Sequence, residues 1–117
     1  MTAAPIVFFD IAGPDSGKLG TFYARVFEWE VGPGGQLDIP TPGGTLPGTL
    51  RSDPKEKLLY IGVPDVTAAL ASIEAAGGKI VAPRFEVPGV VVLGLFTDPA
   101  GNRLGLVELA DGKPKIP

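Results

Sequence analysis

The sequence predicts an α+β fold made of two tandem βαβββ modules. The first observation is the order of its patterns, because a strand, a helix and three strands occur twice within 117 residues. The second is a loose internal repeat: residues 11–15 and residues 63–65, about 52 residues apart, each open a helix. The third is that the 17 glycines and 13 prolines fall between the apolar runs. Neither module can bury a core alone, so we expect paired mixed sheets around a concave pocket.

The first module opens with a strand and a helix. Residues 6–11 are apolar and rich in β-formers, which favours a mostly buried strand. Asp15 or Ser16 can cap a helix that runs to about Phe27. Its apolar stripe recurs at three- and four-residue spacing and consists of Leu19, Phe22, Tyr23, Val26 and Phe27. Three short strands are predicted at residues 29–31, 36–39 and 45–51, the last at a sheet edge because Pro47 removes a ladder donor.

The second module repeats this order after a polar stretch at residues 52–57. Residues 58–63 have the pattern of a second buried strand. Asp65 caps a helix that Gly77 and Gly78 end, because glycine adopts the left-handed conformation at little cost. The apolar stripe of this helix consists of Val66, Ala69, Leu70 and Ile73. Three further strands are predicted at residues 79–82, 90–97 and 103–109.

A single domain over residues 1–117 is the natural organisation for this length. We expect module one at about residues 5–51, a surface linker at about 52–57, module two at about 58–109 and a loose tail at 110–117.

Composition and charge disfavour several classes of function. The net charge is −3, and the ten basic residues are scattered, so nucleic-acid binding is not expected. The N-terminus has no basic region, and Asp10 interrupts its apolar run, which argues against a signal peptide or a membrane span. The chain has no cysteine and therefore no disulfide framework, which fits a cytoplasmic protein.

Four short motifs follow one another on the predicted elements, at residues 22–29, 63–66, 75–78 and 97–102. The first, FYARVFEW, is similar to a signature FYxxvfGW, with Glu28 in place of the usual glycine. The last, TDPAGN, is a closing turn. Together the motifs resemble the vicinal oxygen chelate superfamily, which includes glyoxalase I, bleomycin-resistance proteins and extradiol dioxygenases. The resemblance covers about residues 6–109 and implies the glyoxalase/bleomycin-resistance/dioxygenase-like fold, which by itself implies little about activity.

The resemblance also implies four metal-ligand positions, and this chain offers a donor at none of them. Two fall on Ile6 and Leu58, and the closing glutamate falls on Gly105. The fourth is expected within residues 45–51, which hold no carboxylate. The chain has no histidine, and neither an aliphatic side chain nor a bare glycine can bind a metal. We therefore expect no metal and no other cofactor; Glu108 lies three residues past the implied position, on the opposite face of its strand.

Strand alternation predicts which side chains face the concave pocket. Seven residues are expected to line it: Ile6, Phe8, Asp10, Leu58, Tyr60, Arg103 and Gly105. This lining is mostly apolar, with Asp10 and Arg103 as a candidate ion pair, and is typical of a small-molecule pocket. Core packing is the structural alternative for Phe8 and Leu58, and a salt-bridged strand position is the alternative for Asp10. Trp29 is interpreted as a packing anchor.

Three functions remain open at this point. The leading one is a metal-free protein that binds a small, mostly apolar or aromatic organic molecule, as bleomycin-resistance members do; the pI of about 4.8 suits a cationic ligand. The second is a metal-independent isomerase, lyase or cyclase in which Asp10 or Tyr60 transfers a proton. The third is a module that supports a partner protein. Nucleotide binding is disfavoured because the glycine-rich segments lack a strand-to-helix context, and a homodimer is expected since members of this superfamily usually dimerise.

Overall fold

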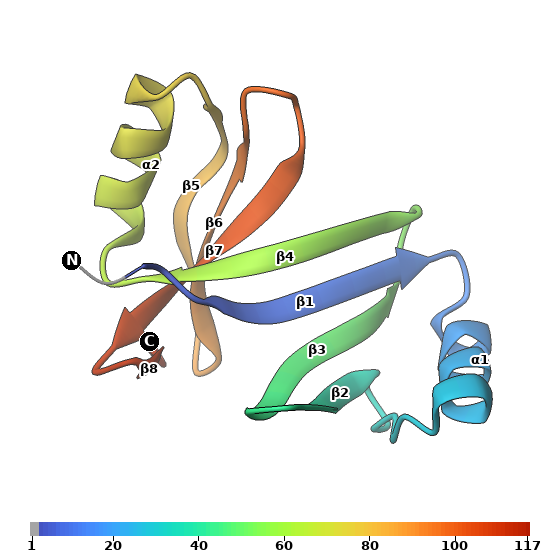
Figure 1. The fold of residues 1–117 in the computed structure, drawn as a ribbon. Coiled ribbons are helices and arrows are strands. Elements are labelled where there is room, and N and C mark those ends of the chain that lie inside the picture. Colours follow the sequence, from blue (N-terminus) through green and yellow to red (C-terminus); the bar gives the residue numbers. More distant parts are fainter. Residues whose placement is uncertain (1–2) are drawn as a thin grey trace. The chain divides into compact units, whose positions relative to one another are not determined.

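The computed structural model describes residues 3–117, and the chain divides into two compact units (Figure 1). The first unit is Phe8–Leu59, and the second is Tyr60–Pro117 together with the N-terminal residues up to Val7. Each unit contains one helix and several strands, which confirms the predicted α+β class. No helix within residues 3–117 is long and apolar enough to cross a membrane.

The first unit is built on β1 (Ile6–Gly13), α1 (Ser16–Phe27), β2 (Gln36–Thr41) and β3 (Gly44–Ser52). Strand β3 pairs antiparallel with β2 and parallel with β1, so the prediction that it is an edge strand is wrong. The parallel ladder begins at the pair Phe9–Gly48, one residue beyond Pro47. Pro47 is therefore tolerated, because no residue of β1 pairs with it and its lack of a backbone N–H breaks no hydrogen bond to that strand.

The predicted strand at residues 29–31 is also wrong, so the first module is βαββ and not βαβββ. Helix α1 ends at Glu28, whose φ of 60° places it in the left-handed region. The chain then reverses, and the indole of Trp29 stacks on the ring of Tyr23 at 4.9 Å and 14°. Packing against the helix has overridden the β-propensity of these residues.

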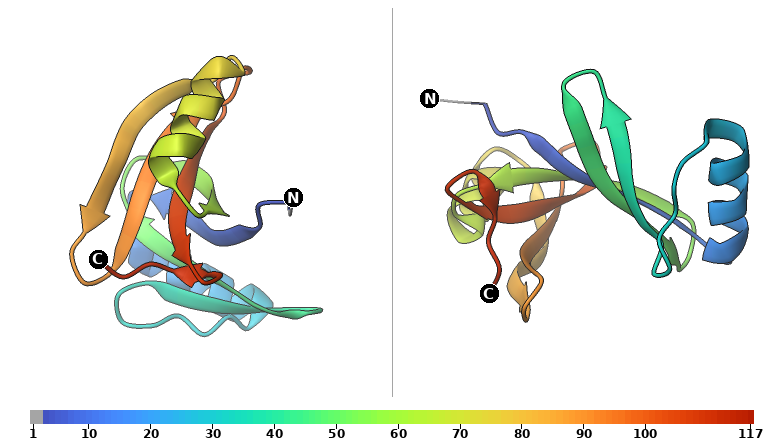
Figure 2. Two further views of the ribbon diagram at one scale, coloured as in Figure 1. Left: turned by 90° about the vertical axis from the view of Figure 1, so that its left-hand side faces the viewer. Right: turned by 90° about the horizontal axis from the view of Figure 1, so that it is seen from below.

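Helix α1 is capped as predicted, because the Asp15 carboxylate accepts a hydrogen bond from the Lys18 N–H at 3.1 Å. Its apolar stripe is present, but the outer members Phe22, Val26 and Phe27 are 53–58 % exposed. The views in Figures 1 and 2 agree that α1 lies to one side of β2 and β3.

The second unit carries the larger sheet. Its elements are the end of β4 (Glu56–Val63, of which residues 56–59 belong to the first unit), α2 (Val66–Ala75), β5 (Lys79–Val87), β6 (Val91–Thr97), β7 (Arg103–Ala110) and β8 (Lys113–Pro114). The strand order is β4-β7-β6-β5, with β8 paired to β7. The β4–β7 pair is parallel, whereas the β7–β6 and β6–β5 pairs are antiparallel.

The core of the second unit lies between α2 and this sheet (Figure 1). It consists of Val66, Leu70, Phe96 and Leu106, all at most 7 % exposed. Gly94 allows the close approach, since a Cβ there would lie 2.7 Å from Val66 Cγ1. The predicted caps are confirmed: the Asp65 carboxylate accepts from Ala68 N–H, and Gly77 follows the helix at φ 100°.

Three predicted boundaries are wrong. Strand β4 begins at Glu56, which shortens the linker to residues 53–55. Strand β5 extends beyond residue 82 to Val87, and register shifts on either side of Ala82 accommodate Pro83. The tail is not loose, because Lys115 N–H donates to the Glu108 carbonyl at 2.8 Å. The turn at residues 98–101 is confirmed by the hydrogen bond from Gly101 N–H to the Asp98 carbonyl at 2.9 Å.

Candidate functional site

The first unit contains an apolar cavity of about 350 Å³ that is partly open to solvent. Six apolar side chains from four strands and one loop line it: Phe9, Ile11, Trp29, Ile39, Leu46 and Leu59. Asp10, Lys57 and Leu58 complete the lining, yet only apolar atoms contribute to the accessible wall. A cavity of this size and character falls within the range that binds small organic molecules.

Local sequence explains why this cavity exists. Phe9 stands opposite Gly48, where a Cβ would overlap its ring, so the aromatic side chain lies flat across β3. The ring of Phe9 meets Trp29 edge-on at 6.1 Å. Trp29 is in turn held by Tyr23 from α1. Phe9 and Trp29 therefore form an aromatic wall of the cavity. Gly48 of β3 leaves room for the ring of Phe9, and Tyr23 of α1 packs against Trp29.

Beside the cavity, Asp10 is only 5 % exposed and is neutralised by Arg51. Nε of Arg51 lies 2.8 Å from both oxygens of Asp10. The same guanidinium donates from Nη1 to Asp53 at 2.9 Å and from Nη2 to Glu56 at 2.8 Å. One cation thus links β1, the turn after β3 and the start of β4.

This arrangement fixes the charge state of Arg51. Burial by itself lowers the pKa of Arg51, but its hydrogen bonds to Asp53, Asp10 and Glu56 outweigh that effect and raise the pKa above its ordinary value. The guanidinium therefore stays charged throughout the physiological pH range. The structural reading of Asp10 as a salt-bridged strand residue is confirmed.

The second unit has a comparable ion pair at Glu108, which is 5 % exposed. Arg84 donates to its carboxylate from Nη2 at 2.8 Å and from Nε at 3.1 Å, and the Val66 N–H donates at 3.0 Å. The hydrogen bonds from Arg84 lower the pKa of Glu108 to about 2, against the effect of burial. Glu108 therefore caps the start of α2 and anchors Arg84 of β5.

The residues at the implied metal positions do not fit a metal ion. Gly105 lies in β7 opposite Tyr60 of β4, and a Cβ at position 105 would overlap the phenol ring. The carbon atoms of the Tyr60 ring fill the space that a glutamate side chain at position 105 would occupy. The chain has no histidine or cysteine, so aspartate and glutamate are the side chains of this group that could bind a metal ion. Within residues 3–117, no three of these carboxylates lie close enough together to hold one.

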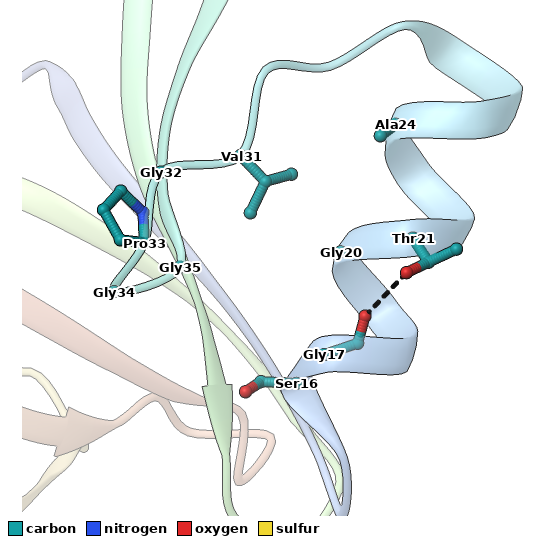
Figure 3. A pocket seen from close by; sticks show the side chains of 10 residues that line it. All are labelled: Ser16, Gly17, Gly20, Thr21, Ala24, Val31, Gly32, Pro33, Gly34 and Gly35. Carbon is teal, nitrogen blue, oxygen red and sulfur yellow. Dashed lines mark hydrogen bonds between the residues drawn. The ribbon is translucent and has the colours of Figure 1, made fainter.

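A second pocket of about 470 Å³ lies between α1 and the loop at residues 31–35 (Figure 3). The helix presents small residues to it: Ser16, Gly17, Gly20, Thr21 and Ala24. The backbone N–H groups of Gly32, Gly34 and Gly35 all donate to acceptors within the loop or to Gln36. The Thr21 hydroxyl donates to the Gly17 carbonyl at 3.1 Å. The N–H groups of Gly32, Gly34 and Gly35 are therefore already used within the protein and are not free to bind a phosphate.

The seven predicted lining residues are divided between the two units. In the first unit Asp10 and Leu58 belong to the apolar cavity, while Phe8 is half-buried outside its lining. In the second unit Tyr60 and Gly105 are in contact. Ile6 is 53 % exposed, and Arg103 is exposed. The predicted common pocket and the Asp10–Arg103 pair stay predictions.

Sequence reasoning missed most of the cavity lining, the partner of Asp10 and one role of Trp29. The lining residues that it did not predict are Phe9, Ile11, Ile39, Leu46, Lys57 and Leu59. Arg51, which holds Asp10, lies 41 positions away in sequence, and no local pattern connects the two. Lys57 was part of the predicted linker but lies in β4 and lines the cavity. Trp29 is a packing residue as predicted, and it also forms part of the cavity wall.

Comparison with known proteins shows the family to which this chain belongs. Residues 6–107 match the model of a family described as glyoxalase-like domain. The chain is similar to a protein of Mycobacterium tuberculosis (strain CDC 1551 / Oshkosh) named "Putative glyoxylase CFP32", at 28% identity over 116 residues, covering 83% of this chain and 42% of the relative. It is similar at 26% identity over 133 residues to the anthracycline biosynthesis protein DnrV of Streptomyces peucetius, covering 89% and 48%. The chain spans less than half the length of these curated relatives.

Solved structures show the same fold. A variant of methylmalonyl-CoA epimerase of Streptomyces coelicolor, in complex with 2-nitronate-propionyl-CoA, matches with a TM-score of 0.68 at 19% identity, covering 97% of this chain and 100% of that one. The hypothetical protein BH1468 of Bacillus halodurans C-125 matches with a TM-score of 0.68 at 9% identity and the same coverage. The likeness at these identities concerns the fold alone and confirms the predicted fold.

Proposed function

Because the chain belongs to the glyoxalase-like domain family, we propose that it binds a small, mostly apolar or aromatic molecule and that it does so without a metal ion. The observation that carries this proposal is the cavity of the first unit, whose accessible wall is entirely apolar and includes Phe9 and Trp29. Aromatic walls of this kind favour flat or aliphatic ligands through area burial and ring contacts.

The metal-free part of the proposal is supported by the donor set. Ile6, Leu58 and Gly105 stand at the implied ligand positions, and Tyr60 fills the space beside Gly105. The two buried carboxylates, Asp10 and Glu108, are each held by an arginine of their own unit. A carboxylate that already accepts two guanidinium hydrogen bonds has little capacity left for a cation.

Proton transfer by Asp10 or Tyr60 is the alternative, and the contacts of both residues weigh against it. Both oxygens of Asp10 accept from Nε of Arg51, so a role as general base requires this pair to open. The ring of Tyr60 lies against Gly105 and is 8 % exposed. Binding without chemistry is therefore the function that the geometry supports best.

Binding is tested by calorimetric titration with 4-phenylbutanol, a neutral probe small enough for the cavity. Burying about 150 Å² of apolar surface contributes about 4 kcal/mol, which corresponds to a Kd of about 1 mM. Leu46→Phe fills the cavity and should weaken binding at least tenfold at unchanged helical and strand content. Thr45→Phe, which adds the same ring to an exposed neighbouring position of β3, should leave binding unchanged.

If Leu46→Phe does not fold, Ile39→Phe tests the same space from β2. Equal affinities of wild type, the cavity-filling variant and Thr45→Phe would refute the proposal that this cavity is the binding site. Heat signals that stay at the dilution level up to about 10 mM probe at two temperatures about 25 °C apart would refute it as well, because the enthalpy of apolar burial vanishes at one temperature only.

A further inference from the structure

We infer that the ligand of the apolar cavity is an organic anion, an aromatic or aliphatic carboxylate, whose charged end is bound by the ammonium group of Lys57. This inference rests on the proposed function and specifies its ligand class. It departs from the expectation of a cationic ligand, which followed from the acidic pI alone.

The first support is the balance of charges on the cavity lining. Only two charged residues belong to it, Asp10 and Lys57. The Asp10 carboxylate is neutralised by Arg51 at 2.8 Å. Lys57 has no ion pair among residues 3–117. Lys57 is therefore the charged lining residue that has no ion pair in the described part of the chain, although Arg51 is shared by three carboxylates and the chain as a whole is acidic.

The second support is the position of the lysine side chain. Lys57 and Leu59 are alternate residues of β4 and lie on one face of that strand, and both line the cavity. The accessible wall is apolar, so the aliphatic atoms of Lys57 form part of it, and a stem of this length lets the ammonium reach solvent at the edge of the cavity. A ligand with an apolar body and a carboxylate at one end could pack its body against the apolar wall and pair its carboxylate with the ammonium of Lys57.

The excess negative charge nearby does not reverse this preference. Asp53 and Glu56 are held by Arg51, and Asp53 is half exposed to water. Neither residue belongs to the cavity lining. The charge of the half-exposed Asp53 is screened by salt. Glu56 directly precedes Lys57 in β4, so its side chain lies on the opposite face of the strand, where it pairs with Arg51.

The chain offers its own reporter for the test. Trp29 is the single tryptophan of the sequence and lines the cavity, so its fluorescence responds to occupation of this site. Three probes share one apolar body and differ in charge: 4-phenylbutyrate, 4-phenylbutanol and 4-phenylbutylammonium. Their single benzene ring leaves excitation of the indole free of overlap.

We expect 4-phenylbutyrate to bind about fivefold more tightly than the alcohol, and the ammonium compound to bind more weakly than both. Lys57→Met keeps the apolar stem and removes the charge, so it should lower the affinity for the carboxylate about fivefold and leave the alcohol unchanged. Lys55→Met removes the same charge two residues away, outside the lining, and should change the carboxylate affinity less than twofold.

Equal binding of the three probes, or equal effects of Lys57→Met and Lys55→Met, would overturn this inference and leave the proposed function standing. Tighter binding of 4-phenylbutylammonium would overturn it in favour of a cationic ligand. If none of the three probes changes the Trp29 emission up to about 10 mM, the inference and the proposed function fail together.

Discussion

The phenol ring of Tyr60 lies flat over Gly105 on the neighbouring parallel strand, in the space that any side chain at position 105 would need. The same device occurs in the first unit, where the ring of Phe9 covers Gly48. In each unit, an aromatic side chain on one strand compensates for a glycine on the next. At Gly105 this packing replaces the metal ligand that the superfamily resemblance implies.

Gly105→Ala should therefore lower the free energy of unfolding by about 2 kcal/mol, because its Cβ overlaps the Tyr60 ring. The cost should fall below about 1 kcal/mol in a Tyr60→Ala background, since the smaller side chain leaves room. Urea unfolding of the four proteins in this double-mutant cycle measures the coupling. Additive effects of the two substitutions would show that the ring does not hold this position.

The Asp10–Arg51 pair should be structural and not catalytic. Asp10→Asn should lower the free energy of unfolding by about 3 kcal/mol, because it leaves Arg51 without its buried partner. Asp53→Asn removes the half-exposed partner of the same guanidinium and should cost below about 1 kcal/mol. Probe binding by folded Asp10→Asn should remain within about twofold of wild type. A loss of binding at intact stability would instead favour direct ligand contact by Asp10.

Because of Glu108, the free energy of unfolding should depend on pH in the acidic range. Its pKa in the folded protein is about 2, below the ordinary value of 4.5, so its contribution is present above pH 4.5 and is lost as the pH falls toward 2. Glu108→Gln should cost about 2 kcal/mol at pH 7, and the difference from wild type should shrink between pH 4.5 and pH 2.

Urea unfolding at several pH values checks this, with Glu74→Gln on the exposed side of α2 as the control for removal of one carboxylate. A wild-type to Glu108→Gln difference that stays constant over this pH range would contradict the assigned role of Arg84.

Glu28→Gly should stabilise the protein by about 1 kcal/mol. Glu28 has φ 60° at the end of α1, a conformation that costs a residue with a Cβ about 1–2 kcal/mol and that glycine adopts freely. Glu30→Gly, at an exposed position of the following loop with no positive φ, is the matched control and should be neutral or destabilising. A lower thermal midpoint for Glu28→Gly than for wild type would refute this explanation.

Much of the fold follows from local patterns in the sequence. Both helices begin at their predicted aspartate caps, and the second one ends at the predicted glycines, because capping is a local interaction. The strand expected at residues 29–31 fails because Trp29 packs back on Tyr23, a contact that β-propensity does not contain. The two-residue strand β8 exists through its pairing with β7 and has no pattern of its own.

The candidate site is less accessible to sequence reasoning. Strand alternation predicted a pocket on the face of Phe8 and Asp10, and that pocket stays a prediction. The cavity of the first unit includes Phe9 and Ile11, which alternate with Asp10 along β1. The partner of Asp10 could not be found in this way, since Arg51 reaches it across the β1–β3 ladder. The position of Lys57 on a strand could not be predicted, because it lies in a polar stretch that has the pattern of a linker. The structure places Lys57 on a strand because β4 begins at Glu56.

The central claim is tested most directly by native mass spectrometry of the purified protein, with metal analysis of the same sample. We expect protein free of stoichiometric divalent metal, with a mass increment that is released on unfolding and is identified as an organic carboxylate. A stoichiometric divalent metal that survives dialysis would contradict the account at its base, because none of Ile6, Leu58 and Gly105 can donate to it.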